Sequence, residues 1–188
     1  MRQIIGIAGP SCSGKTTVAK RLAQELLCDI VSLDNQYILG SPKIYVGDTR
    51  TMERPQLYDG QKLADIANLW KQNGRATFQE LDFATKKLYD RTINDSQYLV
   101  LEGFLLLTYP QIRNACSHTF YIDISWNEIV RRRIGRGRET PEKIDAFLRV
   151  GRQEMEQYVF AQKSLPGVTV LNGSSSIDDT VREIKKRL

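Results

Sequence analysis

A glycine-rich segment near the N-terminus carries the residues with the clearest chemical meaning in this sequence. Residues 9–16 read G-P-S-C-S-G-K-T and fit the pattern G-x-x-x-x-G-K-[S/T]. Glycines let the backbone curl until consecutive N–H groups converge on a phosphate, and the N-terminus of a following helix also favours anions. An apolar run at residues 4–8 precedes the segment and a helical pattern follows it, which is the context this motif requires. We therefore predict a phosphate-binding loop, or P-loop.

The P-loop supplies backbone donors, a cation and a hydroxyl. Lys15 is expected to reach the β- and γ-phosphates of ATP, and the Thr16 hydroxyl is expected to bind Mg²⁺. The residues predicted to bind the nucleotide are Gly9, Ser11, Cys12, Ser13, Gly14, Lys15, Thr16 and Thr17. The Cys12 thiol at a helix N-terminus could be reactive, but we prefer the simpler interpretation of a small residue at a variable position.

Two acidic residues are placed to complete a phosphoryl-transfer site. Asp34 directly follows an apolar run at residues 29–33, and Glu102 follows another at residues 98–101. Because ligands of parallel sheets bind at the carboxyl edge, both acids are expected there. Asp34 could accept the proton of a substrate hydroxyl and help to bind Mg²⁺, and Glu102 could bind Mg²⁺ through water. The competing interpretations are an ordinary loop aspartate and a strand-end glutamate that faces solvent.

Arginine is concentrated in one segment, where five of the eight residues 131–138 are arginine. Consecutive helical residues turn by about 100°, so these side chains cannot all share a face, but Arg132 and Arg136 are four apart and can. Two glycines loosen the segment, which favours a mobile lid over about residues 134–141 that brings guanidinium groups onto the transferred phosphoryl. A solvated helix face and a nucleic-acid patch are the alternatives. Because no aromatic residue interrupts the cluster, we expect no nucleic-acid partner.

The elements that must position these residues alternate between apolar runs and helical patterns, which is typical of βα units around a parallel sheet. Strands are predicted at residues 4–8, 29–33, 98–101, 120–124 and 168–171. Helices are predicted at about residues 14–27 and 63–73, and from Trp126 into the arginine cluster. Two further helices are predicted to begin at Pro141, with Thr140 as the N-cap, and after Ser176, which is the N-cap of the last helix. Residues 35–60 are expected to form a substrate-side loop, and residues 75–90 a small hairpin. His118 would begin the fourth strand in a structural role.

Bulk properties fit one soluble globular domain over residues 1–188. No apolar run approaches the roughly 18 residues of a membrane span, and the first residues do not resemble a signal peptide. Three cysteines, an odd number without metal-binding spacing, favour free thiols in a reducing cytoplasm. A net charge of +5 suits an anionic ligand such as a nucleotide. We therefore expect a cytoplasmic protein with a small-molecule substrate and no membrane partner; the sequence does not predict its oligomeric state.

A P-loop alone does not distinguish kinases from GTPases or transport ATPases. The sequence lacks the N-K-x-D motif of guanine recognition and the L-S-G-G-Q signature of transport ATPases. Together with the two acids at the sheet edge, this favours a kinase.

The sequence resembles the uridine kinase-like P-loop kinases over nearly its whole length, and among them most closely the nicotinamide riboside kinases. The motifs that carry the resemblance are I-G-I-A-G at 5–9, S-G-K-T-T at 13–17, V-S-L-D at 31–34, L-Y-D at 57–59, L-E-G-F-L-L at 101–106, R-R-R at 131–133, R-Q-E-M at 152–155 and V-L-N-G at 170–173.

The resemblance implies an α/β P-loop fold with a five-stranded parallel sheet flanked by helices, an arginine-rich lid, ATP with Mg²⁺, and a nucleoside-like acceptor. Tyr58 and Asp59 match a pair that stacks on the acceptor ring and contacts its ribose hydroxyls. The implied catalytic residues are Asp34, Lys15, Arg133 and Arg136. Arg132 would bind ATP, Asp34 and Arg133 would also contact the acceptor, and Thr16, Asp34 and Glu102 would bind the metal.

Two departures from the family pattern bear on the acceptor. Arg138 stands roughly where nicotinamide riboside kinases have a second stacking tyrosine. Residues 81–86 read L-D-F-A-T-K, without the aromatic hydroxyl or imidazole with which uridine kinases read a uracil edge. The expected reaction is phosphorylation of the 5′-hydroxyl of nicotinamide riboside, giving nicotinamide mononucleotide for NAD biosynthesis. Uridine or cytidine is the alternative acceptor, and a nucleotide-binding regulator without kinase activity is the alternative of a different class.

Overall fold

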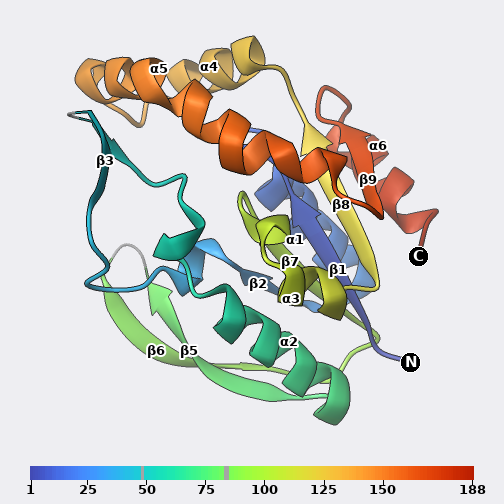
Figure 1. Ribbon diagram of the computed structural model, residues 1–188. Coiled ribbons are helices and arrows are strands. Elements are labelled where there is room, and N and C mark those ends of the chain that lie inside the picture. The colour runs from blue at the N-terminus through green and yellow to red at the C-terminus, as the bar shows by residue number, and fades with distance from the viewer. Residues whose placement is uncertain (48, 83–84) are drawn as a thin grey trace.

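The computed structural model describes residues 1–47, 49–82 and 85–188. Its centre is a five-stranded sheet in the order β2-β7-β1-β8-β9, and every neighbouring pair is parallel (Figure 1). The strands are β1 (Gln3–Ala8), β2 (Asp29–Ser32), β7 (Tyr98–Gly103), β8 (His118–Asp123) and β9 (Val168–Asn172). The predicted α/β P-loop fold with five parallel strands is confirmed.

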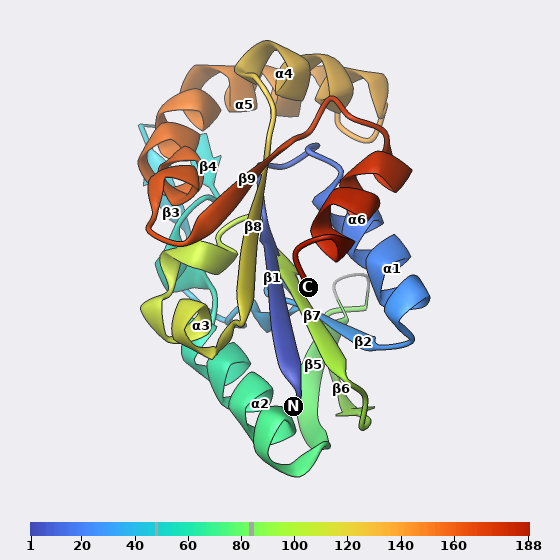
Figure 2. The same ribbon diagram turned by 90° about the vertical axis from the view of Figure 1, so that its right-hand side faces the viewer.

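Helices cover both faces of the sheet, and side chains that alternate along the strands separate the core into two clusters. On one face, Ile5 and Ile7 of β1 pack with α1 (Lys15–Leu26) and α6 (Ile177–Lys185). On the other face, a larger cluster includes residues of α2 (Gly60–Asn73) and α3 (Pro110–Ala115). Figure 2 shows these two helical layers on either side of the strands. Burial on both faces explains why the strands read as continuous apolar runs.

The carboxyl edge of the sheet carries a further pair of helices. α4 (Trp126–Gly135) follows β8 and leads into α5 (Pro141–Glu154), which continues into a π-helical segment, Met155–Val159, and a 3₁₀ segment, Phe160–Ser164. Figure 1 shows α4 and α5 lying across this end of the molecule. Residues 134–141, the expected lid, form the end of α4 and its connection to α5. The movement of this segment stays a prediction.

The segment between β2 and α2 is more ordered than expected. A 3₁₀ turn (Asp34–Gln36), a short antiparallel pair of β3 (Ile44–Val46) and β4 (Thr49–Thr51), and a second 3₁₀ turn (Pro55–Leu57) replace the predicted plain loop. These two strands were not predicted, because strands of three residues are too short to show an alternating pattern. That the segment lies on the substrate side stays a prediction.

The expected hairpin is present as β5 (Ala76–Asp82) paired antiparallel with β6 (Lys87–Ile93). Residues 83 and 84 of its turn, which belong to the L-D-F-A-T-K segment, lie outside the described residues. A third 3₁₀ turn, Leu106–Thr108, follows β7. No helix among the described residues is long and apolar enough to cross a bilayer.

Both predicted N-cap residues lie at the N-caps of their helices, but only one of them makes the capping hydrogen bond with its side chain. The Ser176 side chain accepts a hydrogen bond from the N–H of Asp179 and caps α6, as expected. Thr140 lies at the N-cap of α5 with Pro141 at the first turn, but its side chain makes no capping hydrogen bond. A hydrogen bond between Thr140 and the Glu142 carboxylate, which lowers the pKa of that group, engages the hydroxyl instead.

Two glycines offer a matched test of this packing. A Cβ added at Gly60 would fall inside the ring of Tyr109, whereas one added at Gly135 meets nothing within 4 Å. We expect Gly60→Ala to lower the free energy of unfolding by about 1–3 kcal/mol because the ring must move. Gly135→Ala should leave it unchanged or raise it by up to about 1 kcal/mol, since alanine restricts the unfolded chain. Urea denaturation measures both, and equal effects of the two substitutions would contradict the packing described.

Candidate functional site

The loop between β1 and α1 has the backbone geometry of an anion cradle. Gly9, Cys12 and Gly14 have positive φ angles of 150°, 70° and 89°. A Cβ at Gly9 would lie 2.7 Å from the carbonyl oxygen of Ile122, so a larger residue does not fit there. The turn is closed by a 3.1 Å hydrogen bond from the Ser13 N–H to the Pro10 carbonyl. These conformations turn successive N–H groups toward one point, which is how such loops hold phosphate.

Strand register brings the two predicted acids to this loop. Ile7 of β1 pairs with Glu102 of β7, and Ser32 of β2 pairs with Glu102 from the other side. The Thr16 hydroxyl donates a 3.0 Å hydrogen bond to Oε2 of Glu102. Asp34 follows directly after β2, so Thr16, Glu102 and Asp34 meet at the carboxyl edge as the sequence predicted.

A glycine permits the close approach of Asp34. A Cβ at Gly103 would lie 2.7 Å from the Cβ of Leu33 and 3.6 Å from Oδ1 of Asp34. Glycine therefore lets the chain after β2 pass against the end of β7, and the glycine of the L-E-G motif has a steric reason to be there.

Asp34 is half-buried, with its Oδ1 atom buried, and its carboxylate lies in a mixed electrostatic field. Burial raises its pKa to about 6, the Lys15 ammonium lowers it, Glu102 raises it, and a hydrogen bond from the backbone of Phe104 lowers it. Its Oδ1 is buried and has no hydrogen-bond partner among the described residues. Lys15 is itself buried, with Nζ 6.0 Å from the centroid of the Phe104 ring. An unpartnered buried acceptor oxygen is costly unless a ligand satisfies it, so Asp34 is suited to receive a hydroxyl proton.

The donor set fits Mg²⁺ held together with phosphate. Thr16, Asp34 and Glu102 offer only oxygen ligands, the kind Mg²⁺ prefers. Within the described part of the chain, no group of three or more histidine, cysteine, aspartate or glutamate residues could hold a metal by itself. Mg²⁺ commonly takes one or two carboxylates and completes its shell with water and substrate phosphates, and this arrangement matches that pattern.

Glu53, which the sequence analysis did not identify, lies beside the same groups. Burial raises its pKa to about 7, Arg133 and Lys15 lower it, and Asp34 and Glu154 raise it. Its Oε2 is buried without a hydrogen-bond partner among the residues described. No periodicity marks Glu53, because it lies in the irregular stretch between β4 and the second 3₁₀ turn. A single acidic residue close to a proline does not by itself indicate a functional site.

The predicted arginines occupy three different places. Arg132 donates to the carbonyl oxygens of Cys12 at 3.2 Å and Gly173 at 3.0 Å, so it ties α4 to the P-loop. Arg133 forms two hydrogen bonds to Glu139, at 2.7 and 2.8 Å. Its guanidinium also lies 3.8 Å from the centroid of the Phe147 ring. Arg136 is exposed at the end of α4 and is not brought to Asp34 in this conformation.

Tyr58 and Asp59, expected to hold the acceptor, have clear contacts within the protein. The Tyr58 ring is 5% exposed and makes edge-to-face contacts with Tyr37 and Phe104, at centroid distances of 5.8 and 5.4 Å. Burial, followed by the charges of Asp34 and Glu53, raises the pKa of its hydroxyl, so Tyr58 lies beside both acids. Oδ1 of Asp59 accepts a 2.8 Å hydrogen bond from the Lys62 N–H and caps α2. Ring stacking and ribose contacts by this pair stay predictions.

Two cavities flank the Asp34–Glu53 region. One of about 480 Å³ is lined by Thr16, Lys20, Ile30, Ser32, Asp34, Asn35, Glu80, Tyr89, Arg91 and Glu102. The other, of about 550 Å³, lies between β4 and α5 and includes Glu53, Arg133, Glu139 and Phe147 in its wall. An acceptor that reaches Asp34 can therefore extend along the β5–β6 hairpin or toward α5.

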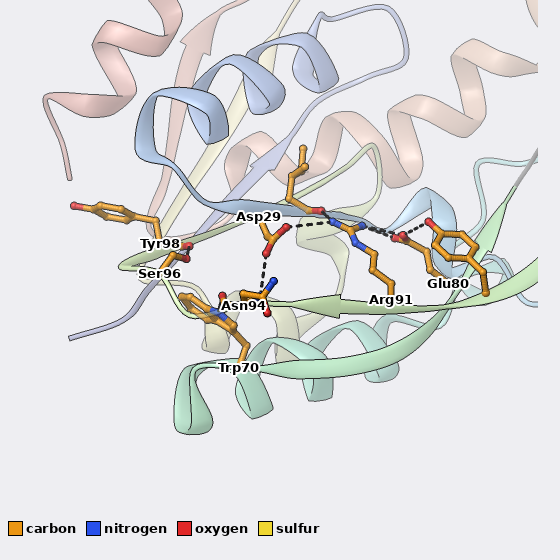
Figure 3. Close-up of polar contacts among 9 residues, drawn as sticks. Asp29, Trp70, Glu80, Arg91, Asn94, Ser96 and Tyr98 are labelled. Carbon is orange, nitrogen blue, oxygen red and sulfur yellow. Dashed lines mark hydrogen bonds and ion pairs between the residues drawn. The ribbon is translucent and has the colours of Figure 1, made fainter.

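The hairpin wall of the first cavity is held by a polar cluster (Figure 3). Arg91 donates to both carboxylate oxygens of Glu80, at 3.1 and 2.8 Å, and to the carbonyl oxygen of Ile30 on β2. The Tyr89 hydroxyl donates a 2.6 Å hydrogen bond to Glu80. The hairpin thus brings an aromatic hydroxyl to the cavity at Tyr89, although residues 81–86 contain none.

The chain is similar in sequence to several uridine kinases and uridine kinase-like proteins. No family model matches the sequence. The chain is 28% identical to a uridine kinase of Shewanella frigidimarina over 92% of its own length and 89% of that protein. It is 23% identical to uridine kinase-like protein 3 and 25% identical to a chloroplastic uridine/cytidine kinase, both of Arabidopsis thaliana. The chain spans about two fifths of these plant proteins, 43% and 38% of their lengths.

Solved structures show the same fold. A possible uridine kinase from Bacillus stearothermophilus matches with a TM-score of 0.62 and 22% identity over 89% of this chain and 88% of that one. Phosphoribulokinase from Rhodobacter spheroides matches with a TM-score of 0.65 and 15% identity over 93% of this chain and 73% of that one. These likenesses show that the chain shares the fold of these two proteins.

The raised pKa of Glu53 predicts a pH effect on stability. Its pKa of about 7 in the folded chain exceeds the value of about 4.3 for an unfolded glutamate, so the folded state holds the proton more tightly between these values. Stability therefore falls as pH rises through this window and levels off above it. We expect Glu53→Gln to raise the free energy of unfolding by about 1–3 kcal/mol at pH 8 and to change it little at pH 5.

Urea denaturation at both pH values measures this effect, and Asp34 accounts for the slope that remains in the variant. Glu183→Gln is the control, because Glu183 on α6 forms an exposed ion pair with Arg187. A Glu53→Gln variant that is no more stable than wild type at pH 8 would show that Glu53 is not buried as described.

Proposed function

We propose that this protein transfers the γ-phosphoryl group of ATP to the 5′-hydroxyl of a ribonucleoside. The observation that carries the proposal is the buried Asp34 carboxylate, with Oδ1 unpartnered, beside Lys15 and the Thr16–Glu102 pair of the P-loop edge. A carboxylate in that place can act as a general base when an acceptor hydroxyl enters the site and supplies the proton. Similarity to uridine kinases supports the same reaction class.

The chain's own groups divide the work of phosphoryl transfer between binding, orientation and proton movement. The P-loop N–H groups and Lys15 would hold the phosphates and stabilise the charge that develops on the transferred group. Thr16 and Glu102, with Asp34, would hold Mg²⁺, which when bound neutralises phosphate charge. Asp34 would orient the acceptor hydroxyl and take its proton at the carboxylate.

The arginines would complete the site by closure. Arg132 already lies against the P-loop backbone, where a small movement of α4 would bring it to the nucleotide. Arg133 and Arg136 would reach the transferred phosphoryl if the α4–α5 connection closed over it. Such contacts, made mainly in the transition state, raise kcat more than they tighten ATP binding.

Nicotinamide riboside is the first acceptor that we propose, because its ring is a permanent cation. The Tyr58 ring is buried against Tyr37 and Phe104, so it would offer an aromatic face only if Tyr37 moved when the acceptor enters. The nearby Asp34 and Glu53 carboxylates would add negative charge when ionised. A cationic ring is stabilised there by cation–π and charge interactions, the first worth roughly 0.5–2 kcal/mol. Asp59 would accept from the ribose hydroxyls with the oxygen that does not cap α2.

Uridine or cytidine is the second candidate, and the hairpin favours it. Tyr89, Glu80 and Arg91 bring hydrogen-bonding groups to the cavity that contains Asp34, and groups of this kind can read the edge of a neutral pyrimidine. The names of the similar proteins point the same way. A P-loop regulator that hydrolyses ATP slowly without an acceptor remains the rival of a different class.

An acceptor screen with ATP·Mg²⁺ tests the proposal directly. ADP release should rise at least about tenfold over the acceptor-free rate with nicotinamide riboside, uridine or cytidine, and not with pantothenate. Asp34→Asn should lower kcat by about 100-fold or more and leave ATP affinity within a few-fold, since the P-loop makes most ATP contacts. Lys15→Ala serves as the control that removes phosphate stabilisation. Slow hydrolysis that no acceptor accelerates would favour the regulator.

A further inference from the structure

A partly buried ion pair, in which Glu154 is buried and Arg54 half-buried, joins the chain next to Glu53 to the end of α5. Arg54 donates from Nε to Oε2 of Glu154 at 2.6 Å and from Nη2 to Oε1 at 2.9 Å. Glu154 is 2% exposed and lies 100 residues away in the sequence. Such paired hydrogen bonds fix the guanidinium in direction as well as in position.

The Tyr158 side chain also binds the guanidinium group of Arg54. The Tyr158 hydroxyl accepts a 2.7 Å hydrogen bond from Nη1, and the guanidinium carbon lies 5.0 Å from the centroid of the same ring. Tyr158 belongs to the π-helical segment Met155–Val159 that follows α5. Short π-helical segments in proteins occur frequently at functional sites. Three side-chain hydrogen bonds and a ring contact hold this arginine in place more firmly than a single exposed ion pair would.

The neighbour of Arg54 in the chain is Glu53, which lines the cavity of about 550 Å³ together with Arg133 and whose buried Oε2 has no hydrogen-bond partner among the described residues. The backbone of Arg54 is extended, with φ −111° and ψ 123°, and in extended chain successive side chains point in opposite directions. Holding the Arg54 side chain therefore fixes the backbone next to Glu53, which lies in the wall of the cavity between β4 and α5. On its other side, Glu53 is held by a 3.1 Å hydrogen bond from its N–H to the Thr51 hydroxyl.

We propose that Arg54, held by Glu154 and Tyr158, is a positioning residue that fixes the Glu53 carboxylate for acceptor binding. The proposal rests on the proposed function and adds to it that the acceptor bound at Asp34 also contacts Glu53. Loss of the ion pair should raise the KM of the acceptor, while the ATP contacts of the P-loop on the opposite side of Asp34 persist. Misplacement of a binding group by about 1 Å can cost as much as 100-fold, so the effect is measurable.

The decisive variant removes both charges at once. Arg54→Met alone would leave the buried Glu154 unpaired and could unfold the protein, whereas replacing a whole buried ion pair by apolar residues is often neutral or stabilising. We therefore expect Arg54→Met/Glu154→Met to melt near the wild-type temperature, yet to show an acceptor KM raised about 10-fold or more, with the KM for ATP within about threefold. Arg54→Lys, which keeps the charge but loses the paired geometry, should give an intermediate acceptor KM.

Arg2→Met is the matched control, because Arg2 also forms a long-range pair, with Asp95, at 2.7 Å near the opposite end of the strands. Its acceptor KM should equal that of wild type. If the double methionine variant folds as stably as wild type and keeps the wild-type acceptor KM, the ion pair is only structural and the proposal is wrong. The same conclusion follows if Arg2→Met raises the acceptor KM as much.

A crystal structure of the double variant shows the position of the Glu53 carboxylate without any measurement of activity. The proposal requires the Glu53 carboxylate to leave its place beside Asp34 and Lys15, and an unmoved carboxylate would overturn it. If wild type phosphorylates no riboside, the proposed function fails, but this structural comparison still decides the role of Arg54.

Discussion

The burial of the Asp34 carboxylate beside Lys15 and Glu102 is the interaction on which the site depends. Taken alone, burial disfavours the charged carboxylate and raises its pKa, and Lys15 partly offsets that cost. These opposing effects give the carboxylate a pKa of about 6. Its Oδ1 has no hydrogen-bond partner among the described residues. It is therefore able both to accept a proton and to bind a cation, which are the two tasks that phosphoryl transfer to a hydroxyl requires.

The fold can be understood as the means of bringing these charges together. Parallel strands end at one edge, so the P-loop after β1, Glu102 in β7 and Asp34 after β2 meet without any long connection. Glycine at 103 lets the chain before Asp34 pass close to β7, and glycine at 9 lets the P-loop pass close to β8. α4 and α5 then add the arginines from above this edge, and α5 also reaches Arg54 through Glu154.

The sequence predicted those parts of the structure whose causes are local. Apolar runs identified all five strands of the sheet, and the P-loop, Glu102 and Asp34 were placed at one edge because strand ends of a parallel sheet coincide. Glu53 was missed because its burial depends on tertiary contacts with Arg133 and Lys15 that no spacing reveals. The β3–β4 pair was not predicted because strands of three residues are too short to show an alternating pattern. Asp59 caps α2 with one carboxylate oxygen, and its contact with the acceptor stays a prediction.

The central claim, that Asp34 is a buried carboxylate with its ionisation set against Lys15, can be tested in the ligand-free protein. Carbon-13 NMR of the aspartate carboxyl groups, with Asp34→Asn for assignment, gives the pKa of Asp34 directly. We expect a pKa of about 6, and a higher pKa in Lys15→Met because the ammonium that lowers it is gone. A pKa near the ordinary value of about 3.9, or one that Lys15→Met leaves unchanged, would contradict this description of the site.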